Sequence, residues 1–476
     1  MPRARRTDRV AAWPACVATL GFLATASGKA TTYVSPSVAR SAVAPPRPAA
    51  PVPPQMSRTD ERIACPVPEE GIAHAVELMR EGAMFRYTFP DGGESPVTTA
   101  ERALADYTGH KYCVALNSGA TALYLSIRAA GVEPGSKVLC NAFTFGAVPS
   151  AIVHAGCEVV YVESKEDYTI DVDDLKAVIK EQPDCKALML SHMRGRVGEM
   201  DAIAEICKEA GVVLLEDCAH SLGVLYNGKH TGHHGVACGV SAQSFKMLNS
   251  GEGGFLLTDD PEIAIRAAIY AGAYEKNAAK HGTKNLPAEE PHHAKLAVEL
   301  PNLSVRMSAL HAAVLIPQMS TLDERIAEYE VRYDNLAEKI RSSPAANAAL
   351  YIPDDLPEVR AVHDELLFTI RPEAIERAAG GQVDAESLRE VVARFQDACA
   401  ERGLVMNLFG SQINARNFKN WRYAPHEVHS KPLEQTTELI RASFGIRLPM
   451  QWQRAEIMEI ADVLEYCAGE VFGQEA

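Results

Sequence analysis

One lysine stands in a setting that suits covalent chemistry. Lys246 lies among apolar neighbours in the run SAQSFKMLNS and is followed by the glycine-rich turn GEGG at residues 251–254. Burial disfavours the ammonium form and lowers a lysine pKa, and Schiff-base formation with a carbonyl group requires the neutral amine. The same pattern also fits a lysine that extends to solvent beside an ordinary glycine turn. Lys246 is therefore a candidate nucleophile whose role depends on its neighbours.

A carboxylate follows an apolar run upstream of this lysine. Residues 212–215 predict a buried strand that ends at Glu216 and Asp217. Ligands of open α/β sheets bind at the carboxyl ends of the strands. Pyridoxal phosphate needs an anion there, because a carboxylate beside the ring nitrogen keeps the ring electron-withdrawing. We interpret Asp217 as that partner; the alternative is a carboxylate that caps the next helix.

Two further segments could hold the rest of a flat phosphorylated cofactor. The turn Asn117-Ser118-Gly119 leads into a helical pattern from Thr121, and free N–H groups at a helix start bind phosphate. Phe145 follows a strand predicted over residues 137–140, where an aromatic ring can stack on a cofactor or belong to the core.

These segments, in this order, resemble the DegT/DnrJ/StrS family of sugar aminotransferases, which are pyridoxal-phosphate enzymes of the aspartate aminotransferase fold type I. The strongest match is the lysine segment ending in GEGG. Others are NSG at 117–119, FTF at 143–145, HMRG at 192–195, EDCA at 216–219 and NLSVRMSALHAA at 302–313.

The resemblance implies a role for each site residue. Lys246 would form the Schiff base with pyridoxal 5'-phosphate, Asp217 would pair with the pyridine nitrogen and Phe145 would stack on the ring. A shared dimer site is implied as well, in which the asparagine comes from the neighbouring subunit of a homodimer. The residues implied to hold the phosphate are Gly119, Ala120, Thr121, Ser241 and Asn302.

Two positions depart from the family pattern. Ala120 stands where the family most often has threonine, so a hydroxyl contact shifts to Thr121 or is lost. His220 stands where glutamine is frequent. We count His220 among the catalytic and cofactor-binding candidates, because it could stack, donate to a cofactor oxygen or add acid–base capacity near neutral pH. The alternative is a histidine that only begins a helix.

The family resemblance also implies the reaction. A dehydratase branch of the family carries histidine in place of the lysine, so the presence of Lys246 favours transamination. We expect ping-pong transfer of an amino group from an amino acid, glutamate first, to a keto sugar that is nucleotide-linked. Alternatives are an aminocyclitol or other keto-substrate aminotransferase, a sugar dehydratase, and a cofactor-binding regulatory protein without turnover.

These residues need a scaffold that brings strand ends together. Short apolar runs alternate with amphipathic segments, which predicts βαβ units and a parallel sheet. The resemblance implies the type I fold: a large α/β domain with a mainly parallel seven-stranded sheet flanked by helices, and a smaller α+β domain. We expect a targeting presequence at 1–56, the large domain at 57–330 and the small domain at 331–476.

Several secondary elements follow from the pattern. Residues 310–340 predict one helix that links the domains, 277–295 a loop over the site, 361–370 a strand, and 385–402 and 451–472 helices. Arg416, Lys419, Trp421 and Arg422 mix cations and aromatics, and either contact a nucleotide sugar or form a solvated domain edge.

Bulk properties exclude some partners. The chain has 476 residues, a net charge of -15 and a pI near 5.5, which argues against nucleic-acid or anionic-membrane surfaces. Its 11 cysteines include no CxxC pair and predict reduced thiols. His230, His233 and His234 cluster without cysteine or acidic partners at ligand spacing, so no metal site is predicted.

The N-terminus has the composition of a targeting sequence. Four arginines within residues 3–9 precede an apolar stretch at 10–26, which is typical of a secretory signal. Residues 27–55 lack acidic residues and are rich in proline, as in transit-like segments. The two together predict import into an organelle, a plastid in the first place, with the secretory pathway as the alternative.

Overall fold

The computed structural model describes residues 53–60, 64–89, 94–274, 277–281, 286 and 291–473. The presequence predicted at 1–56 therefore lies outside the described residues, apart from its last four. From Pro53 onward the chain forms one compact unit, which holds two main sheets. The boundary predicted at residue 330 stays a proposal.

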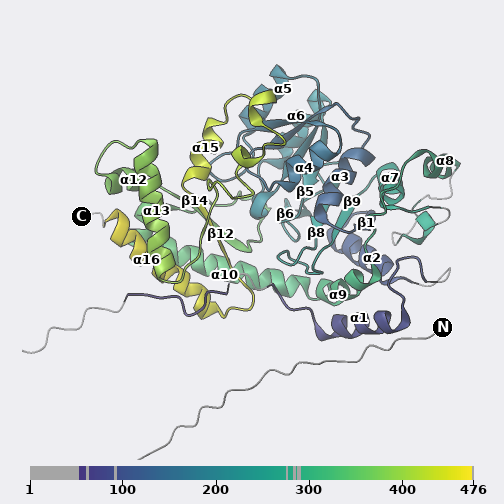
Figure 1. Ribbon diagram of the computed structural model, residues 1–476, viewed down its shortest axis with the longest axis horizontal. Coiled ribbons are helices and arrows are strands. Elements are labelled where there is room, and N and C mark those ends of the chain that lie inside the picture. The colour runs from purple at the N-terminus through teal and green to yellow at the C-terminus, as the bar shows by residue number, and fades with distance from the viewer. Residues whose placement is uncertain are drawn as a thin grey trace, which may run out of the picture. The chain divides into compact units, whose positions relative to one another are not determined.

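A seven-stranded sheet with the order β1-β9-β8-β5-β4-β2-β3 lies at the centre of the first half (Figure 1). The strands from β8 to β3 pair in parallel, whereas β9 is antiparallel to both β1 and β8. This confirms the predicted mainly parallel sheet of seven strands. The strands are β1 (Tyr112–Leu116), β2 (Lys137–Asn141), β3 (Glu158–Val162), β4 (Cys185–Ser191), β5 (Val213–Asp217), β8 (Ala237–Ser241) and β9 (Gly254–Thr258).

Both faces of this sheet are buried, as expected for parallel strands between helices. Along β1, Cys113 and Ala115 belong to one apolar core and Val114 and Leu116 to the other. The second core includes α3 (Gly119–Ala129), α4 (Ala147–His154) and α7 (Pro261–Ala271). The first includes α2 (Pro96–Thr108), α5 (Val172–Glu181), α6 (Met200–Ala210) and α9 (Ala309–Met319), and α1 (Glu69–Glu81) packs on α9.

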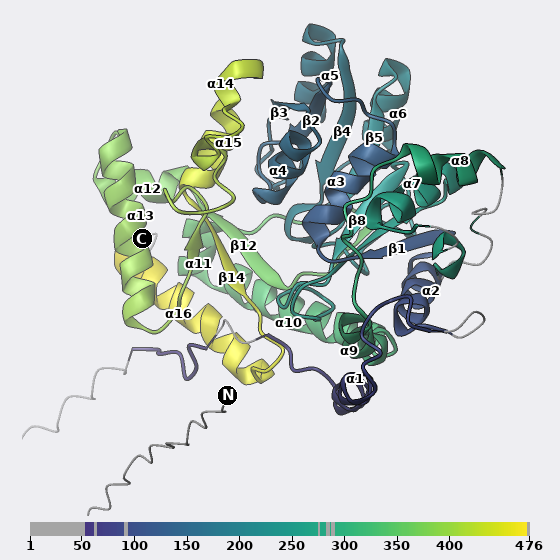
Figure 2. The same cartoon turned by 45° about the vertical axis from the view of Figure 1, so that its right-hand side comes forward.

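The second sheet is antiparallel, with the order β10-β12-β14-β13 (Figure 2). Its strands are β10 (Leu350–Tyr351), β12 (Glu365–Ile370), β13 (Asn407–Leu408) and β14 (Ser443–Arg447). The predicted strand near 361–370 is β12, and the predicted helices are α13 (Ala385–Glu401) and α16 (Arg454–Phe472). Further helices are α11 (Pro344–Ala349), α12 (Pro372–Ala379), α14 (His426–His429) and α15 (Glu434–Arg441).

The single helix predicted over 310–340 is wrong. The chain forms α9 and α10 (Leu322–Ser342) with a break at Ser320 and Thr321. Pro317 lies inside α9, and its missing N–H removes a hydrogen bond to the carbonyl four residues earlier, so the break that follows Met319 depends on packing and not on this proline. Helix α10 then leads to the part that holds β12 and β14 (Figures 1 and 2).

The loop predicted at 277–295 is also partly wrong. Its start is the 3-10 turn Asn277–Lys280, and its end belongs to α8 (Pro291–Glu299), which packs on α7. A small third sheet joins β6 (Leu225–Tyr226), β7 (Lys229–His230) and β11 (Val359–Arg360). Among the described residues, no helix combines the length and the apolar character that crossing a membrane requires.

Candidate active site

The predicted site residues meet where strands of the large sheet end. Asp217 is the last residue of β5 and Ser241 is the last residue of β8, and these neighbouring strands run parallel. Gly119 begins α3, directly beyond β1. Because parallel strands end at one edge of a sheet, this fold places the three residues on the same side. Lys246 follows β8 in the loop that leads to β9.

Lys246 and His220 form the central contact of the site. The amine nitrogen Nζ of Lys246 lies 2.6 Å from Nε2 of His220. Burial lowers the pKa of Lys246 to about 7, and the positive charge of Arg194 contributes to that shift. Burial, followed by the charge of Lys246, also lowers the pKa of His220 well below its ordinary value. Near neutral pH the pair therefore offers an uncharged imidazole and a large fraction of uncharged amine.

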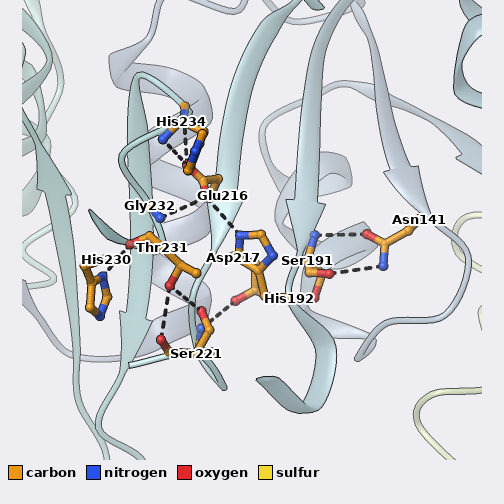
Figure 3. Close-up of polar contacts among 12 residues, drawn as sticks. Asn141, Ser191, His192, Glu216, Asp217, Ser221, His230, Thr231, Gly232 and His234 are labelled. Atoms are coloured by element: carbon orange, nitrogen blue, oxygen red, sulfur yellow. Dashed lines mark hydrogen bonds and ion pairs between the residues drawn. The ribbon is translucent and has the colours of Figure 1, made fainter. Parts of the chain in front are cut away.

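Asp217 is held in a fixed orientation. The hydroxyl of Ser191 donates to its Oδ2 at 2.8 Å, and the backbone N–H of Ala219 donates to its Oδ1 at 3.1 Å. Ser191 is itself positioned by Asn141, whose Oδ1 accepts from the Ser191 N–H at 2.9 Å (Figure 3). The Asp217 side chain is 5% exposed. A buried carboxylate with one free lone-pair direction on each oxygen fits the protonated nitrogen of a heteroaromatic ring.

The neighbouring Glu216 has a structural role. Its carboxylate accepts from Nε2 of His192 at 2.9 Å and from the backbone N–H groups of Gly232, His234 and Gly235 (Figure 3). Burial acts to raise its pKa, but His192 and the backbone donors outweigh it and hold the pKa at about 2. Glu216 thus ties the end of β5 to the 232–235 turn, and its oxygens are already occupied.

Two groups of three potential metal ligands occur among the described residues. One is His192, Glu216 and Cys218, and the other is Glu262, His292 and His293. In the first, the hydrogen bonds just described use the carboxylate. In the histidine cluster noted in the sequence, His233 packs against another histidine. The rings of His110 and His233 stack with centroids 3.6 Å apart, and His233 Nε2 lies 2.8 Å from the Thr108 carbonyl oxygen.

The start of α3 lies against Ser241. A β-carbon on Gly119 would lie only 2.7 Å from the Ser241 β-carbon, so glycine is what permits this approach. The Ser118 hydroxyl caps the helix by accepting from the Thr121 N–H at 3.1 Å, while the Thr121 hydroxyl donates to Asn117 Oδ1 at 2.8 Å. The backbone N–H of Gly119 and of Ala120 and the Ser241 hydroxyl are the groups beside which a phosphate fits.

Phe145 and Asn302 lie farther out. The Phe145 ring is 42% exposed and borders a cavity of about 870 Å³ that Ala120, Thr121 and Trp421 also line. Its open face suits stacking with a flat ring. Asn302 is exposed, and its Oδ1 accepts from the Ser304 hydroxyl at 3.1 Å. Its predicted reach into a neighbouring subunit stays a prediction.

Sequence reasoning missed the buried charges around the lysine. Arg194 lies in the turn after β4 with φ 58°, and its guanidinium forms an ion pair with Glu365 at 2.5 Å. The sequence could have indicated Arg194, because it belongs to the HMRG segment of the family pattern. It held no signal for Glu365, which lies far away in the sequence. Of the mixed cation and aromatic segment, Trp421 is buried and its indole N–H donates to the Ala415 carbonyl at 3.1 Å.

A clamp fixes the loop that carries the lysine. The side chain of Gln318, at the end of α9, accepts from the Asn249 N–H at 2.9 Å and donates to the Asn249 carbonyl at 2.7 Å. The Asn249 amide in turn donates to the Cys65 carbonyl at 2.6 Å. The backbone three residues beyond Lys246 is thus tied to two other segments, and movement of the amine comes from its side chain.

These groups fit pyridoxal phosphate. The fold offers an amine of low pKa, a buried carboxylate and a helix start with free N–H groups, all at one sheet edge. In the described part of the chain the buried Nδ1 of His220 has no hydrogen-bond partner, which leaves a polar atom for a ligand to satisfy.

Comparison with known proteins agrees with this geometry. A model of the DegT/DnrJ/EryC1/StrS aminotransferase family matches residues 91–378. The chain is 29% identical over 231 residues to a GDP-perosamine synthase of Caulobacter vibrioides, covering 48% of this chain and 58% of that protein. It is 33% identical over 233 residues to a UDP-2-acetamido-2-deoxy-3-oxo-D-glucuronate aminotransferase of Pseudomonas aeruginosa, covering 48% and 60%. The match thus spans about 60% of the length of these relatives.

Solved structures show the same fold. An aminotransferase from Psychrobacter cryohalolentis superposes with a TM-score of 0.69 at 18% identity, covering 86% of this chain and 100% of that one. This confirms the predicted fold class.

Proposed function

Because the chain belongs to the DegT/DnrJ/EryC1/StrS aminotransferase family, we propose that it moves an amino group from an amino acid to a keto sugar. Its cofactor is pyridoxal phosphate, as in the family. The observation that carries the proposal is the amine of the half-buried Lys246, whose pKa is lowered to about 7 and whose Nζ lies 2.6 Å from Nε2 of His220. An uncharged lysine amine at neutral pH is the group that this chemistry needs.

Lys246, Asp217 and His220 have separate roles in this chemistry. When bound, pyridoxal phosphate supplies an aldehyde and an electron-withdrawing ring. Lys246 would hold the aldehyde through its amine, and the same amine, when free, would act as the base that moves a proton. Asp217, oriented by Ser191 and the Ala219 N–H, would stabilise a positive charge on the ring nitrogen. His220 accepts a hydrogen bond from the amine and stays uncharged, so it does not repel an incoming ammonium group.

The finer assignments rest on the relatives. Two of them are named for reactions of nucleotide-linked sugars, which supports a nucleotide-linked keto sugar as the acceptor. Glutamate is our first choice of donor, and alternation of the two substrates at one site gives ping-pong kinetics. An aminocyclitol acceptor is the second candidate, since another relative is named as an L-glutamine:scyllo-inosose aminotransferase.

Assembly and location complete the proposal. We propose a homodimer in which Asn302 of one subunit reaches the site of the other, and an organellar location reached through the N-terminal presequence. The exposure of Asn302 is compatible with such a contact. Sedimentation of the purified chain tests the first, and a fluorescent fusion of residues 1–56 tests the second.

The decisive experiment is absorbance spectroscopy of the full chain with pyridoxal phosphate. We expect the wild type to develop a visible band that Lys246→Ala lacks, and glutamate to bleach that band and release 2-oxoglutarate. Lys229→Ala, which removes an exposed lysine, is the matched control and should behave as the wild type. A band that Lys246→Ala retains would contradict the assignment.

A further inference from the structure

Three potential metal ligands meet at the start of two neighbouring helices. Glu262 lies in the first turn of α7, and His292 and His293 lie in the first turn of α8. The two helices pack side by side (Figure 1). One carboxylate oxygen and one nitrogen of each ring all lie within 4.8 Å of one another. This group of three side chains is called the α7–α8 cluster below.

The distances within the α7–α8 cluster match those around a tetrahedral ion. Nε2 of His292 and Nε2 of His293 each lie 3.2 Å from the same oxygen, Oε2 of Glu262. Nitrogen and oxygen ligands lie about 2.0–2.2 Å from tetrahedral zinc, which places two ligand atoms about 3.3 Å apart. The two imidazole rings are tilted by 57° with centroids 5.3 Å apart, so they approach the carboxylate from different directions. His292 is exposed and can rotate to close the remaining gap.

The carboxylate of the α7–α8 cluster is oriented by a neighbour on its own helix. Nε of Arg266 donates to Oε1 of Glu262 at 2.7 Å, which leaves Oε2 for the two histidines. Burial acts to raise the pKa of Glu262, but the hydrogen bonds of Arg266 and His292 outweigh it and keep the pKa below its ordinary value. Glu262 is therefore an ionised group with a fixed orientation, which is the state in which a carboxylate binds a metal.

The types of donor atom select the ion. Two imidazoles and one carboxylate suit zinc, whereas magnesium and calcium prefer a full set of oxygen ligands. Each histidine presents the lone pair of Nε2 when its proton is on Nδ1, so the atoms that hydrogen-bond to Glu262 are also the atoms that bind an ion. Because His292 is exposed, water reaches the fourth position of a tetrahedral site.

Little apolar surface holds α8 to α7. His293 and Leu296 are the buried residues among the nine of α8, each of which the structure describes. Val298 is 85% exposed. A short helix is marginal unless an apolar face is buried. Beyond its end, the N–H of Leu303 donates to the Tyr270 carbonyl at 2.8 Å, so a contact at the start of α8 would hold the helix from its other side.

The α7–α8 cluster lies away from the reactive lysine. Ser241, at the end of β8, pairs with Gly254 at the start of β9, and β9 ends with Thr258 at the opposite edge of the sheet. Helix α7 begins beyond that edge, at Pro261. An ion bound there has a structural role and takes no part in the chemistry at Lys246.

We propose that Glu262, His292 and His293 bind a zinc ion that fastens α8 to α7. The ion replaces two weakly directed hydrogen bonds with metal–ligand bonds to both helices. This site goes beyond the proposed aminotransferase function and does not depend on it.

The test uses the full chain loaded with pyridoxal phosphate, freed of metal by a chelator and titrated with zinc chloride in a calorimeter. His292→Gln is the main variant, because its side chain is exposed and the replacement should leave the fold unchanged. His74→Gln, in α1, is the matched control. We expect wild type and His74→Gln to bind zinc with equal affinity, and His292→Gln to bind it at least about tenfold more weakly. Equal affinity of His292→Gln and wild type overturns the proposal.

Two further measurements identify the ligands. X-ray absorption at the zinc edge should show nitrogen and oxygen neighbours at about 2.0–2.1 Å with the outer-shell pattern of imidazole. A sulfur neighbour at about 2.3 Å would place the ion on a cysteine and overturn the proposal. An excess of magnesium chloride should leave the zinc in place, because magnesium binds imidazole poorly, and its displacement would contradict a histidine site.

Hydrogen exchange measured by mass spectrometry tests the fastening of α8. Zinc should slow amide exchange in residues 291–300 of the wild type and have no such effect in His292→Gln. Unchanged exchange in the zinc-bound wild type would overturn the fastening. The Lys246-dependent visible band should be the same in His292→Gln and wild type, so failure of the zinc site leaves the aminotransferase assignment intact.

Discussion

Gly119 faces Ser241 so closely that a β-carbon on residue 119 would lie 2.7 Å from the Ser241 β-carbon. The end of β8 and the start of α3 can therefore pack together only because residue 119 has no side chain. This contact brings together the groups that fit a phosphate.

We expect Gly119→Ala to weaken pyridoxal phosphate binding about tenfold or more, because the methyl group must push α3 away from Ser241. Equilibrium dialysis measures the affinity. Gly469→Ala is the control: the nearest atom to its β-carbon would be 3.8 Å away, within a helix, so this change should leave cofactor binding alone and help the helix slightly. Equal affinity in Gly119→Ala and wild type would show that this contact does not shape the phosphate site.

The rate of cofactor capture should depend on pH through Lys246. Burial lowers its pKa to about 7, so the fraction of reactive neutral amine rises with pH through a midpoint near 7 and levels off only well above it. Stopped-flow absorbance between pH 5 and 9 measures this. Arg194→Gln removes a positive charge that lowers this pKa, so the midpoint should move to higher pH. A midpoint that stays in place would mean that Arg194 does not act on the amine.

Replacement of His220 separates two of its possible roles. Glutamine can still hydrogen-bond the Lys246 amine but cannot take up a proton, whereas alanine can do neither. If His220 contributes acid–base catalysis, both variants load the cofactor and lose turnover by roughly 10- to 100-fold or more. If it only orients the amine, His220→Gln keeps most of the activity and His220→Ala does not. Steady-state kinetics with spectroscopic loading decides between them.

Glu216→Gln should unfold more easily than any exposed carboxylate variant. Removing the charge leaves His192 and the backbone donors of the 232–235 turn poorly paired, which costs about 3–5 kcal/mol. Urea unfolding measures it, with the exposed Glu209→Gln as the control, expected within about 0.5 kcal/mol of wild type.

The pH dependence gives this stability prediction a second test. The folded-state pKa of Glu216, about 2, lies below its ordinary 4.5. Its stabilising contribution is therefore complete above about pH 4.5 and is lost as the pH falls towards 2. Wild type and Glu216→Gln should differ in stability near neutral pH and converge in acid. A constant difference across this range would contradict the assignment.

The sequence predicted the large sheet because local signals determine it. Apolar runs such as 212–215 must be buried on both faces, and the residues at their ends then meet at one edge. Residues 310–340 were misjudged because their apolar spacing continues through Pro317 and into α10, while the break depends on packing. Residues 277–295 carry too little periodicity to reveal α8.

The charges of the site depend on distant contacts. Arg194 lies in the turn after β4 of the large sheet and Glu365 begins β12 of the second sheet, and only the folded chain brings them to 2.5 Å. Arg416 was noted for its composition, but its position 5.5 Å from the centroid of the Phe145 ring follows from the route of the segment after β13, for which the sequence holds no local signal.

The clamp between Gln318 and Asn249 decides which part of the chain the lysine loop belongs to. Gln318 lies in α9, before the break at Ser320 and Thr321, and α10 begins after it. The clamp therefore joins the backbone three residues beyond Lys246 to α9 and not to the C-terminal part of the chain. The amine thus keeps a constant origin beside the large sheet, and its reach is set by the length and rotamer of its own side chain.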